Sequence, residues 1–156
     1  WNNEIIEFGR DKDFVDIRFN KFPNKYVYYQ IFDQHEKLRG YFVCRVEIWR
    51  GMRVLIVSDY RFVIGDGDAL NCILFVSKKL MQQNKMDAIL FGSSIQWIDE
   101  TVQKNNFKKV GVPSEILTNL TLDTNWEQKA TERRFIFATP ADSDFEFNLG
   151  NELWIK

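Results

Sequence analysis

Histidine and cysteine are scarce in this chain, which contains one histidine and two cysteines. The single histidine, His35, stands in a polar stretch, which argues against a histidine-dependent catalytic triad, and no second histidine exists for a zinc site. Cys44 and Cys72 each lie inside an apolar run, and no C-x-x-C spacing occurs. We therefore expect two packed thiols rather than a metal or redox site.

Long hydrophobic runs and a large net charge are also lacking. No apolar stretch approaches the ~20 residues of a membrane-spanning helix, and no basic-then-apolar leader precedes Glu4. A cytoplasmic, reducing location without a membrane partner is the expectation. The 21 basic and 22 acidic side chains give a formal net charge of -1. No overall field would hold the chain on nucleic acid, although a local basic patch is compatible with these numbers.

Apolar and aromatic residues, by contrast, are plentiful. The 156 residues are 45% hydrophobic and 28% charged, and 14 of them are Phe. This balance predicts a single globular domain over residues 1–156 with a core rich in aromatic rings. The chain opens on Trp1 instead of Met, which is compatible with a piece of a longer chain that carries further domains.

The first half of the chain alternates between strand-like runs and turn signals. Asp11 and Asp13 can cap a short helix that carries Phe14 to Phe19 and ends before Pro23. Residues 33–37 form a polar hairpin loop that ends at Gly40, and Arg50 with Gly51 has the spacing of a tight turn. These signals separate three predicted antiparallel strands, at residues 26–32, 41–49 and 52–57.

The pattern then changes to a helical period. Apolar residues recur at helical spacing over residues 69–84. The unbroken apolar run Ala88–Phe91 is typical of a strand buried on both faces, so it must pair in parallel with 52–57. Ser93 and Gln96 form an S-x-x-Q capping box for a second helix at 95–105. Further strands are predicted at 116–122, 134–138 and 145–147.

Together these elements predict an α/β (α+β) domain with a single mixed, mainly antiparallel sheet and flanking helices. Their order resembles that of the Gcn5-related N-acetyltransferase (GNAT) superfamily. The stretch Asp13-Phe-Val-Asp-Ile-Arg-Phe before Phe22-Pro-Asn-Lys-Tyr resembles the entry segment of bacterial GNAT-like proteins linked to surface polysaccharide. The stretch Phe135-Ile-Phe-Ala-Thr-Pro-Ala-Asp-Ser-Asp resembles their closing aromatic strand.

The resemblance implies a coenzyme A site before the first long helix. In the superfamily an R/Q-x-x-G-x-G/A loop presents backbone N–H groups to the pyrophosphate. Here the matching stretch has Arg61, Gly65 and Gly67 but is one residue longer than that pattern. Ser93 completes the candidate cofactor-binding set. Asp66 and Asp68 place carboxylates where the pyrophosphate would lie, and Asp68 could itself cap the helix.

The resemblance also implies a general acid, which the family often supplies as a tyrosine on the helix after the fifth strand. The predicted helix 95–105 contains Trp97 but no tyrosine. Asp59 and Tyr60 follow the fourth strand directly and are the candidate base and acid. A solvated turn with an aspartate cap is the alternative for these two residues.

Other groupings of polar residues have weaker support. Asp142, Asp144 and Glu146 alternate, which suits either a hard cation or an acidic edge strand. Ser93 and Ser94 follow Gly92, but the G-x-S-x-G pattern of a hydrolase is absent.

Two functions stay open from the sequence. The first is a divergent N-acyltransferase that uses acetyl-CoA or another acyl-CoA on an amine, such as an amino sugar or another polysaccharide precursor, without a metal. The second is a GNAT-like recognition or assembly module that has lost coenzyme binding.

Overall fold

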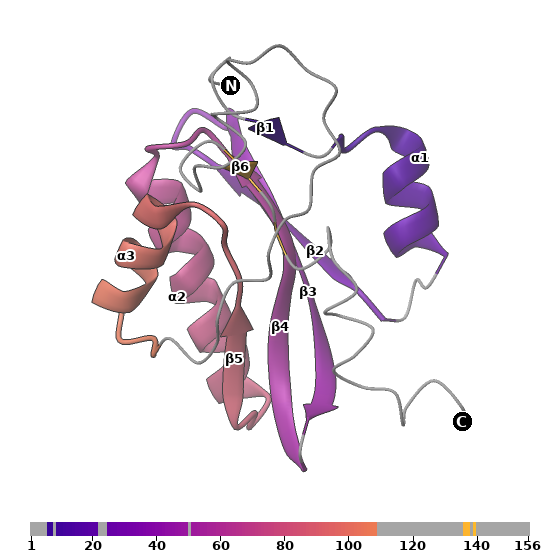
Figure 1. The fold of residues 1–156 in the computed structure, drawn as a ribbon, viewed down its shortest axis with the longest axis vertical. Helices are drawn as coiled ribbons and strands as arrows, with labels where there is room; N and C mark the ends of the chain where they lie inside the picture. The colour runs from indigo at the N-terminus through magenta and orange to yellow at the C-terminus, as the bar shows by residue number, and fades with distance from the viewer. Residues whose placement is uncertain are drawn as a thin grey trace, which may run out of the picture.

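The protein is built around one central sheet with helices on both faces. The computed structural model describes residues 6–7, 9–21, 25–49, 51–108, 136–137 and 139. The sheet has the strand order β2-β3-β4-β5. Helices α2 and α3 cover one face and α1 lies on the other, as Figure 1 shows. The strand bounds are β2 (Val27–Phe32), β3 (Leu38–Trp49), β4 (Met52–Phe62) and β5 (Ala88–Phe91).

The helices carry the connections between these strands. Helix α1 (Lys12–Val15) continues as a wider π-helical turn over Asp16–Asn20, and α2 (Gly67–Gln83) crosses from β4 to β5. Helix α3 (Gln96–Lys104) follows β5. None of the helices in the described ranges is long and apolar enough to cross a membrane.

Strand pairing confirms the predicted mixed sheet. Strands β2 and β3 pair antiparallel, as do β3 and β4. Strand β5 pairs with β4 in parallel, in a register that runs from Val54 opposite Ala88 to Val57 opposite Phe91. A parallel pair needs a crossover connection, and α2 provides it.

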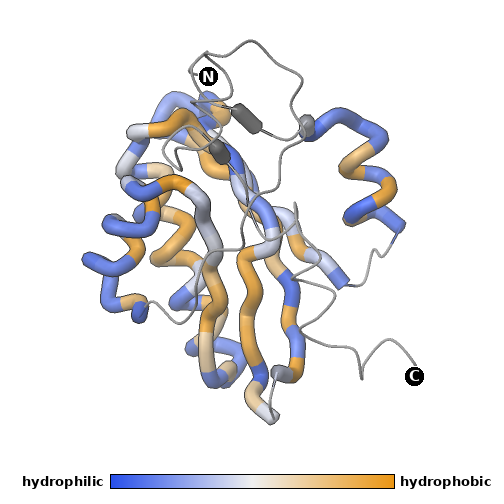
Figure 2. The backbone as a smooth tube through the Cα atoms, in the orientation of Figure 1, coloured by the Kyte–Doolittle hydropathy of each residue, from blue (hydrophilic) through white to orange (hydrophobic). Residues whose placement is uncertain are grey.

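The main core lies between the sheet and the helices α2 and α3. Ile73 and Leu74 of α2 are 0% and 1% exposed, as the helical period predicts. They pack with Leu55 and Val57 of β4 and with Ile98 of α3. Figure 2 shows apolar residues concentrated along β4 and β5, the strands under these helices. A smaller core on the opposite face contains Phe19, Tyr26 and Val43.

Two strands are longer than the sequence predicts. Strand β3 begins at Leu38 rather than at residue 41, and β4 continues to Phe62 rather than ending at residue 57. The predicted loop residue Gly40 therefore lies inside β3, opposite Phe62. A Cβ atom at this position would lie 2.3 Å from the carbonyl oxygen of Arg61. Glycine here thus permits a close approach of two strands, where the sequence pattern had indicated a loop end.

The helix starts also differ from expectation. Helix α2 begins at Gly67, and its cap is Asp66, not Asp68. Helix α3 begins at Gln96 with Ile95 as its cap, so the predicted capping box at Ser93 and Gln96 does not form. The expected cap of α1 is confirmed, because the Asp11 carboxylate accepts the N–H of Phe14 at 2.8 Å.

The C-terminal predictions are tested only in part. Within the predicted strand 134–138, Ile136–Phe137 forms β6, which pairs in parallel with β1 (Ile6–Glu7). The predicted strands at 116–122 and 145–147 lie outside the described residues, as do the alternating carboxylates from Asp142 to Glu146. No group of residues that could hold a metal ion occurs in the part of the chain that the structure describes.

Candidate functional site

The sheet opens at one place, where β4 continues beyond its pairing with β5. The parallel register ends at Val57 opposite Phe91. At the next residue, Ser58, β4 carries one extra residue relative to β3, because Cys44 pairs with Val57 while Val43 pairs with Asp59. Such a β-bulge bends and twists a strand. The two parallel strands therefore part at Ser58, and among the described residues no strand pairs with the far half of β4 on its β5 side.

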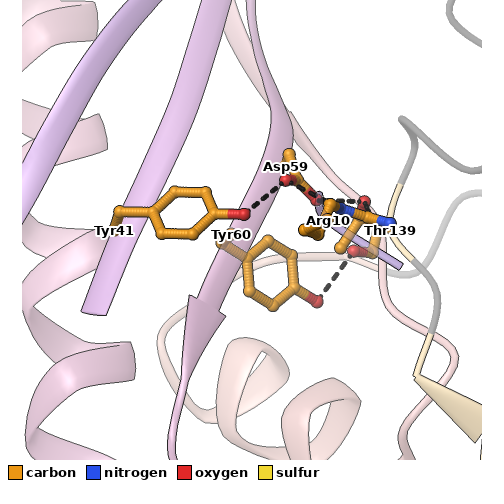
Figure 3. A network of polar contacts seen from close by, with 6 residues as sticks. Arg10, Tyr41, Asp59, Tyr60 and Thr139 are labelled. Carbon is orange, nitrogen blue, oxygen red and sulfur yellow. Dashed lines mark hydrogen bonds and ion pairs between the residues drawn. The ribbon is translucent and has the colours of Figure 1, made fainter. Parts of the chain in front are cut away.

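Asp59, the candidate base, lies just beyond this bulge in a buried polar network (Figure 3). Arg10 binds its carboxylate through two nitrogens, with Nε 3.0 Å from Oδ2 and Nη2 2.9 Å from Oδ1. Tyr41 donates its hydroxyl to Oδ2 at 3.0 Å, and Thr139 donates to Oδ1 at 2.7 Å. The network joins the segment before α1, the middle of the sheet and the segment after β6. The charge of Asp59 is thus compensated by Arg10, and both of its carboxylate oxygens already accept hydrogen bonds.

The tyrosine in this network is held in its neutral form. Burial raises the pKa of Tyr41, and the negative charge of Asp59 raises it further. Its hydroxyl therefore serves Asp59 as a hydrogen-bond donor over the ordinary pH range. Figure 3 shows the Tyr41 ring reaching Asp59 from its own strand, β3.

Tyr60, the candidate acid, faces the other side of the sheet. Its hydroxyl donates to the carbonyl oxygen of Gly92 at 3.0 Å, across the point where β4 and β5 part (Figure 3). Its ring stacks on Phe91 with the ring centroids 4.8 Å apart and on Phe62 at 5.8 Å. The side chain is fully buried. Tyr60 therefore lies at the opening of the sheet, within an aromatic cluster, instead of in the solvated turn that was the alternative for these two residues.

The loop before α2 turns through Gly65, which has a φ of +94° that favours glycine. The helix N-terminus behind it is an anion site by its geometry, because free N–H groups and the helix dipole both attract negative charge. Here the site is filled by the protein's own carboxylate. The first backbone N–H groups of the helix already have acceptors. Those of Asp68 and Ala69 donate to the Asp66 carboxylate, and that of Leu70 donates to the Asp66 carbonyl oxygen. The N–H of Gly67 donates to the carbonyl oxygen of Gly65.

Asp66 also holds a partner from β3. The guanidinium of Arg39 donates to Asp66 Oδ2, with Nε at 2.9 Å. Burial alone would raise the pKa of Asp66, but the N–H of Ala69 and the guanidinium of Arg39 outweigh it and lower the pKa. The sequence predicted that the Asp66 carboxylate would repel a pyrophosphate. In the structure its charge is balanced by Arg39, and it accepts a hydrogen bond from the first turn of α2.

One predicted cofactor residue, Arg61, has its side chain on the other face of the sheet from α2. Arg61 lies inside β4, paired with Tyr41, and alternation along the strand puts its side chain on the face opposite Tyr60 and Phe62. Arg39, not Arg61, is thus the arginine found at the start of α2. Ser93 lies next to Gly92 at the opening, where its hydroxyl oxygen accepts the N–H of Ile95 at 3.0 Å.

Several residues of the site could not be found from sequence spacing. Arg10 binds Asp59 across 49 positions, and Thr139 does so across 80. No local motif marks such pairs. Arg39 left a weak signal, because it directly precedes Gly40, whose pairing with Phe62 brings this part of β3 to the start of the α2 loop.

A mixed sheet whose parallel strands part at a bulge, with a glycine-containing loop leading into the crossover helix, is a GNAT-like fold. Searches with protein-family models and among curated proteins found no match. Solved structures do match. A protein named as a probable acetyltransferase superposes with a TM-score of 0.52 at 13% identity, covering 71% of this chain and 77% of its own.

Two further structures agree with this one. A Pyrococcus furiosus protein, assigned to the acetyl transferases by name alone, has a TM-score of 0.51 at 11% identity, with 72% of this chain and 83% of its own covered. The BH1408 protein of Bacillus halodurans, solved as a tetramutant, has a TM-score of 0.50 at 14% identity, with 62% and 69% covered. These superpositions show that the chain shares a fold with structures named as acetyltransferases. At such low sequence identity they do not show its activity, which has to be tested.

Proposed function

We propose that the domain is an acyl-CoA dependent N-acyltransferase. The observation that carries this proposal is the opening of the sheet at Ser58, which leaves one edge of β4 beyond Val57 without a strand partner among the described residues. An extended ligand with amide groups can add to such an edge by main-chain hydrogen bonds. The pantetheine arm of coenzyme A is a ligand of this kind.

The residues at the start of α2 fit a diphosphate once Asp66 moves aside. The carboxylate of Asp66 and a phosphate would use the same N–H groups, and Arg39 would pair with either anion. An aspartate cap contributes only about 1 kcal/mol. A doubly charged diphosphate at the same dipole can therefore displace it.

Acyl-CoA, when bound, supplies an acyl group activated as a thioester. The attacking amine forms the new C–N bond, and the C–S bond breaks. Tyr60 would give its phenolic proton to the departing sulfur, since its hydroxyl lies at the opening, 3.0 Å from the Gly92 oxygen. Asp59 stays the candidate base, but its side chain faces the opposite side of the sheet from Tyr60. It would therefore receive the proton of the ammonium through water rather than directly, and Arg10 would have to release one carboxylate oxygen.

The acceptor is an amine in this proposal. An amino sugar or another precursor of a surface polysaccharide is the first class to test, because two segments of the sequence resemble bacterial proteins of that kind. No nucleic acid or membrane is required.

Binding is tested by isothermal titration with acetyl-CoA and with free CoA. Asp66→Asn removes the charge but keeps a capping oxygen, whereas Asp66→Ala also frees the N–H groups of α2. The expected affinity for CoA rises from the natural chain to Asp66→Asn and again to Asp66→Ala. Asp68→Asn is the matched control, since the Asp68 carboxylate is not the acceptor of the first N–H groups of α2, and it should change the affinity little. No binding heat in any variant would refute coenzyme binding.

Catalysis is tested by following the release of free CoA thiol with a panel of amines. Tyr60→Phe removes only the hydroxyl, so kcat should fall by about a hundredfold or more while KM for acyl-CoA stays close to that of the natural chain. Tyr29→Phe is the control, because Tyr29 lies on the edge strand β2, two strands away from Tyr60 on the same face of the sheet, where it stacks on Phe42. Equal kcat in both variants would remove Tyr60 from the mechanism.

One observation favours the second candidate function, a recognition or assembly module. The first N–H groups of α2 are all satisfied from within the chain. If even Asp66→Ala binds neither acetyl-CoA nor CoA, the anion site is purely structural, and the recognition module becomes the better explanation.

A further inference from the structure

Ser58, the residue at which β4 and β5 part, carries a buried hydroxyl group. Its side chain is 0% exposed, and its Oγ atom has no hydrogen-bond partner in the part of the chain that the structure describes. Burying a hydroxyl without a partner costs free energy, so the large majority of buried polar groups in proteins are paired. An unpaired hydroxyl that lies at a candidate site therefore points to a polar group of a ligand.

The bulge decides on which side of the sheet this hydroxyl lies. Ser58 is the extra residue of β4, so Ser58 and Asp59 together lie opposite Val43 of β3. Val43 belongs to the smaller core on the α1 face, whereas Val57 and Tyr60, on either side of the pair, belong to the main core. Ser58 is therefore on the side of Asp59, the candidate base, and away from Tyr60, the candidate acid.

The hydroxyl of Ser58 has no evident part in holding the fold together. The neighbouring Asp59 carboxylate accepts its hydrogen bonds from Arg10, Tyr41 and Thr139 instead. A buried strand position is also one where a β-branched apolar residue packs better than serine. Both observations favour a role for this hydroxyl in binding a reactant.

We propose that the Ser58 hydroxyl binds the acceptor amine and holds it against the thioester. This inference rests on the proposed acyl transfer and adds the residue that positions the nucleophile. A primary amine arrives as an ammonium group with three N–H donors, and the hydroxyl oxygen has lone pairs to accept one of them. Ser58 forms no covalent bond and keeps its own proton, while the ammonium loses one proton through water to Asp59.

The first measurement needs no activity. Because the hydroxyl is unpaired in the free protein, Ser58→Ala should have a urea midpoint equal to or higher than that of the natural chain. Ser77→Ala is the matched control, since Ser77 of α2 is also 0% exposed and its Oγ also lacks a partner among the described residues. A clearly lower midpoint in Ser58→Ala would mean that its hydroxyl supports the fold, and the proposal would fail.

The second measurement follows the release of CoA thiol from acetyl-CoA, with glucosamine or the panel amine that the natural chain acylates fastest, and also without amine, when water is the acceptor. Ser58→Ala should raise KM for the amine about tenfold, as the loss of one hydrogen bond does. KM for acetyl-CoA and the rate of hydrolysis without amine should not change, and Ser77→Ala should change none of the three. An unchanged KM for the amine, or an equal fall in hydrolysis, would count against Ser58 alone. No CoA release with any amine would overturn the acyl transfer and this inference together.

Two isosteric variants separate the hydroxyl from the space that it occupies. Ser58→Thr keeps the hydroxyl, and Ser58→Val has a methyl group in its place, so any crowding by the added methyl is common to both. KM for the amine should stay within about threefold of the natural value in Ser58→Thr and rise about tenfold in Ser58→Val. Equal KM values in these two variants would show that the hydroxyl does not bind the amine.

Discussion

The buried ion pair between Asp59 and Arg10 should contribute strongly to the stability of the domain, and this can be measured. Asp59 and Arg10 have side chains that are 0% and 6% exposed. Removing one member leaves the other charge buried without its partner, which costs about 3 to 5 kcal/mol for buried pairs. A domain of this size is stable by only about 5 to 15 kcal/mol, so either single change should lower stability severely.

A double-mutant cycle isolates the pair. Asp59→Asn keeps the shape and one of the two acceptor oxygens that Tyr41 and Thr139 use, and Arg10→Met keeps most of the aliphatic stem. Each single variant should lose about 3 to 5 kcal/mol, but the double variant should lose about as much as one of them, because no unpaired charge remains. Urea unfolding followed by tryptophan fluorescence measures all three, provided that the slope with urea is unchanged.

The exposed pair Lys12 and Asp16 is the control for this cycle. Its oppositely charged atoms are also close, at 2.6 Å, but the two side chains are 87% and 41% exposed. Solvent screens such a pair, so its coupling should be indistinguishable from experimental error. Additive losses at Asp59 and Arg10 would refute the reasoning. If the single variants do not fold, Arg10→Lys, which keeps the charge but loses the second N–H bond, should give a smaller and measurable loss.

Three other changes test the fold and the loop. Leu74→Ala should cost about 2 to 5 kcal/mol in urea unfolding, because the side chain is only 1% exposed in the main core. Gly40→Ala should lower stability by about 1 to 3 kcal/mol, since its Cβ would meet the Arg61 oxygen at 2.3 Å. Asp66 has a pKa below its ordinary 3.8, so its stabilisation is complete above about pH 4 and is lost as the pH falls through the lower folded value. Urea midpoints of the natural chain and Asp66→Ala should therefore differ at neutral pH and converge in acid.

Most of the sheet could be predicted because its signals are local. Apolar periodicity marks α2, the turn at Gly51 separates β3 from β4, and a crossover helix requires the parallel pairing with β5. The extra length of β4 had no such signal. Its last residues are buried or half-buried because they pair with β3 beyond the bulge at Ser58, and a bulge leaves no fixed pattern in sequence.

The sequence predicted the location of the candidate site but not the contacts of its side chains. The glycines before α2 and the end of the parallel register indicated where a ligand site would lie. The partners of each side chain were not predictable, because Arg10 and Arg39 reach Asp59 and Asp66 through tertiary contacts. The sequence also could not tell which of two neighbouring aspartates caps the helix, since Asp66 and Asp68 are equally good caps by residue type.

That choice of cap decides how the anion site should be understood. A loop that had lost its ligand without replacement would leave buried N–H groups unsatisfied, which proteins avoid because each one costs about 1 to 3 kcal/mol. Here Asp66 satisfies those groups and Arg39 balances its charge, so the site keeps its donors and its cation while lacking a ligand. A diphosphate would offer this arrangement more charge and more acceptor oxygens than the single carboxylate of Asp66. The start of α2 is therefore better described as an anion site occupied by its own aspartate than as one that has been removed, and the titration of Asp66→Ala with CoA decides between the acyltransferase and the recognition module.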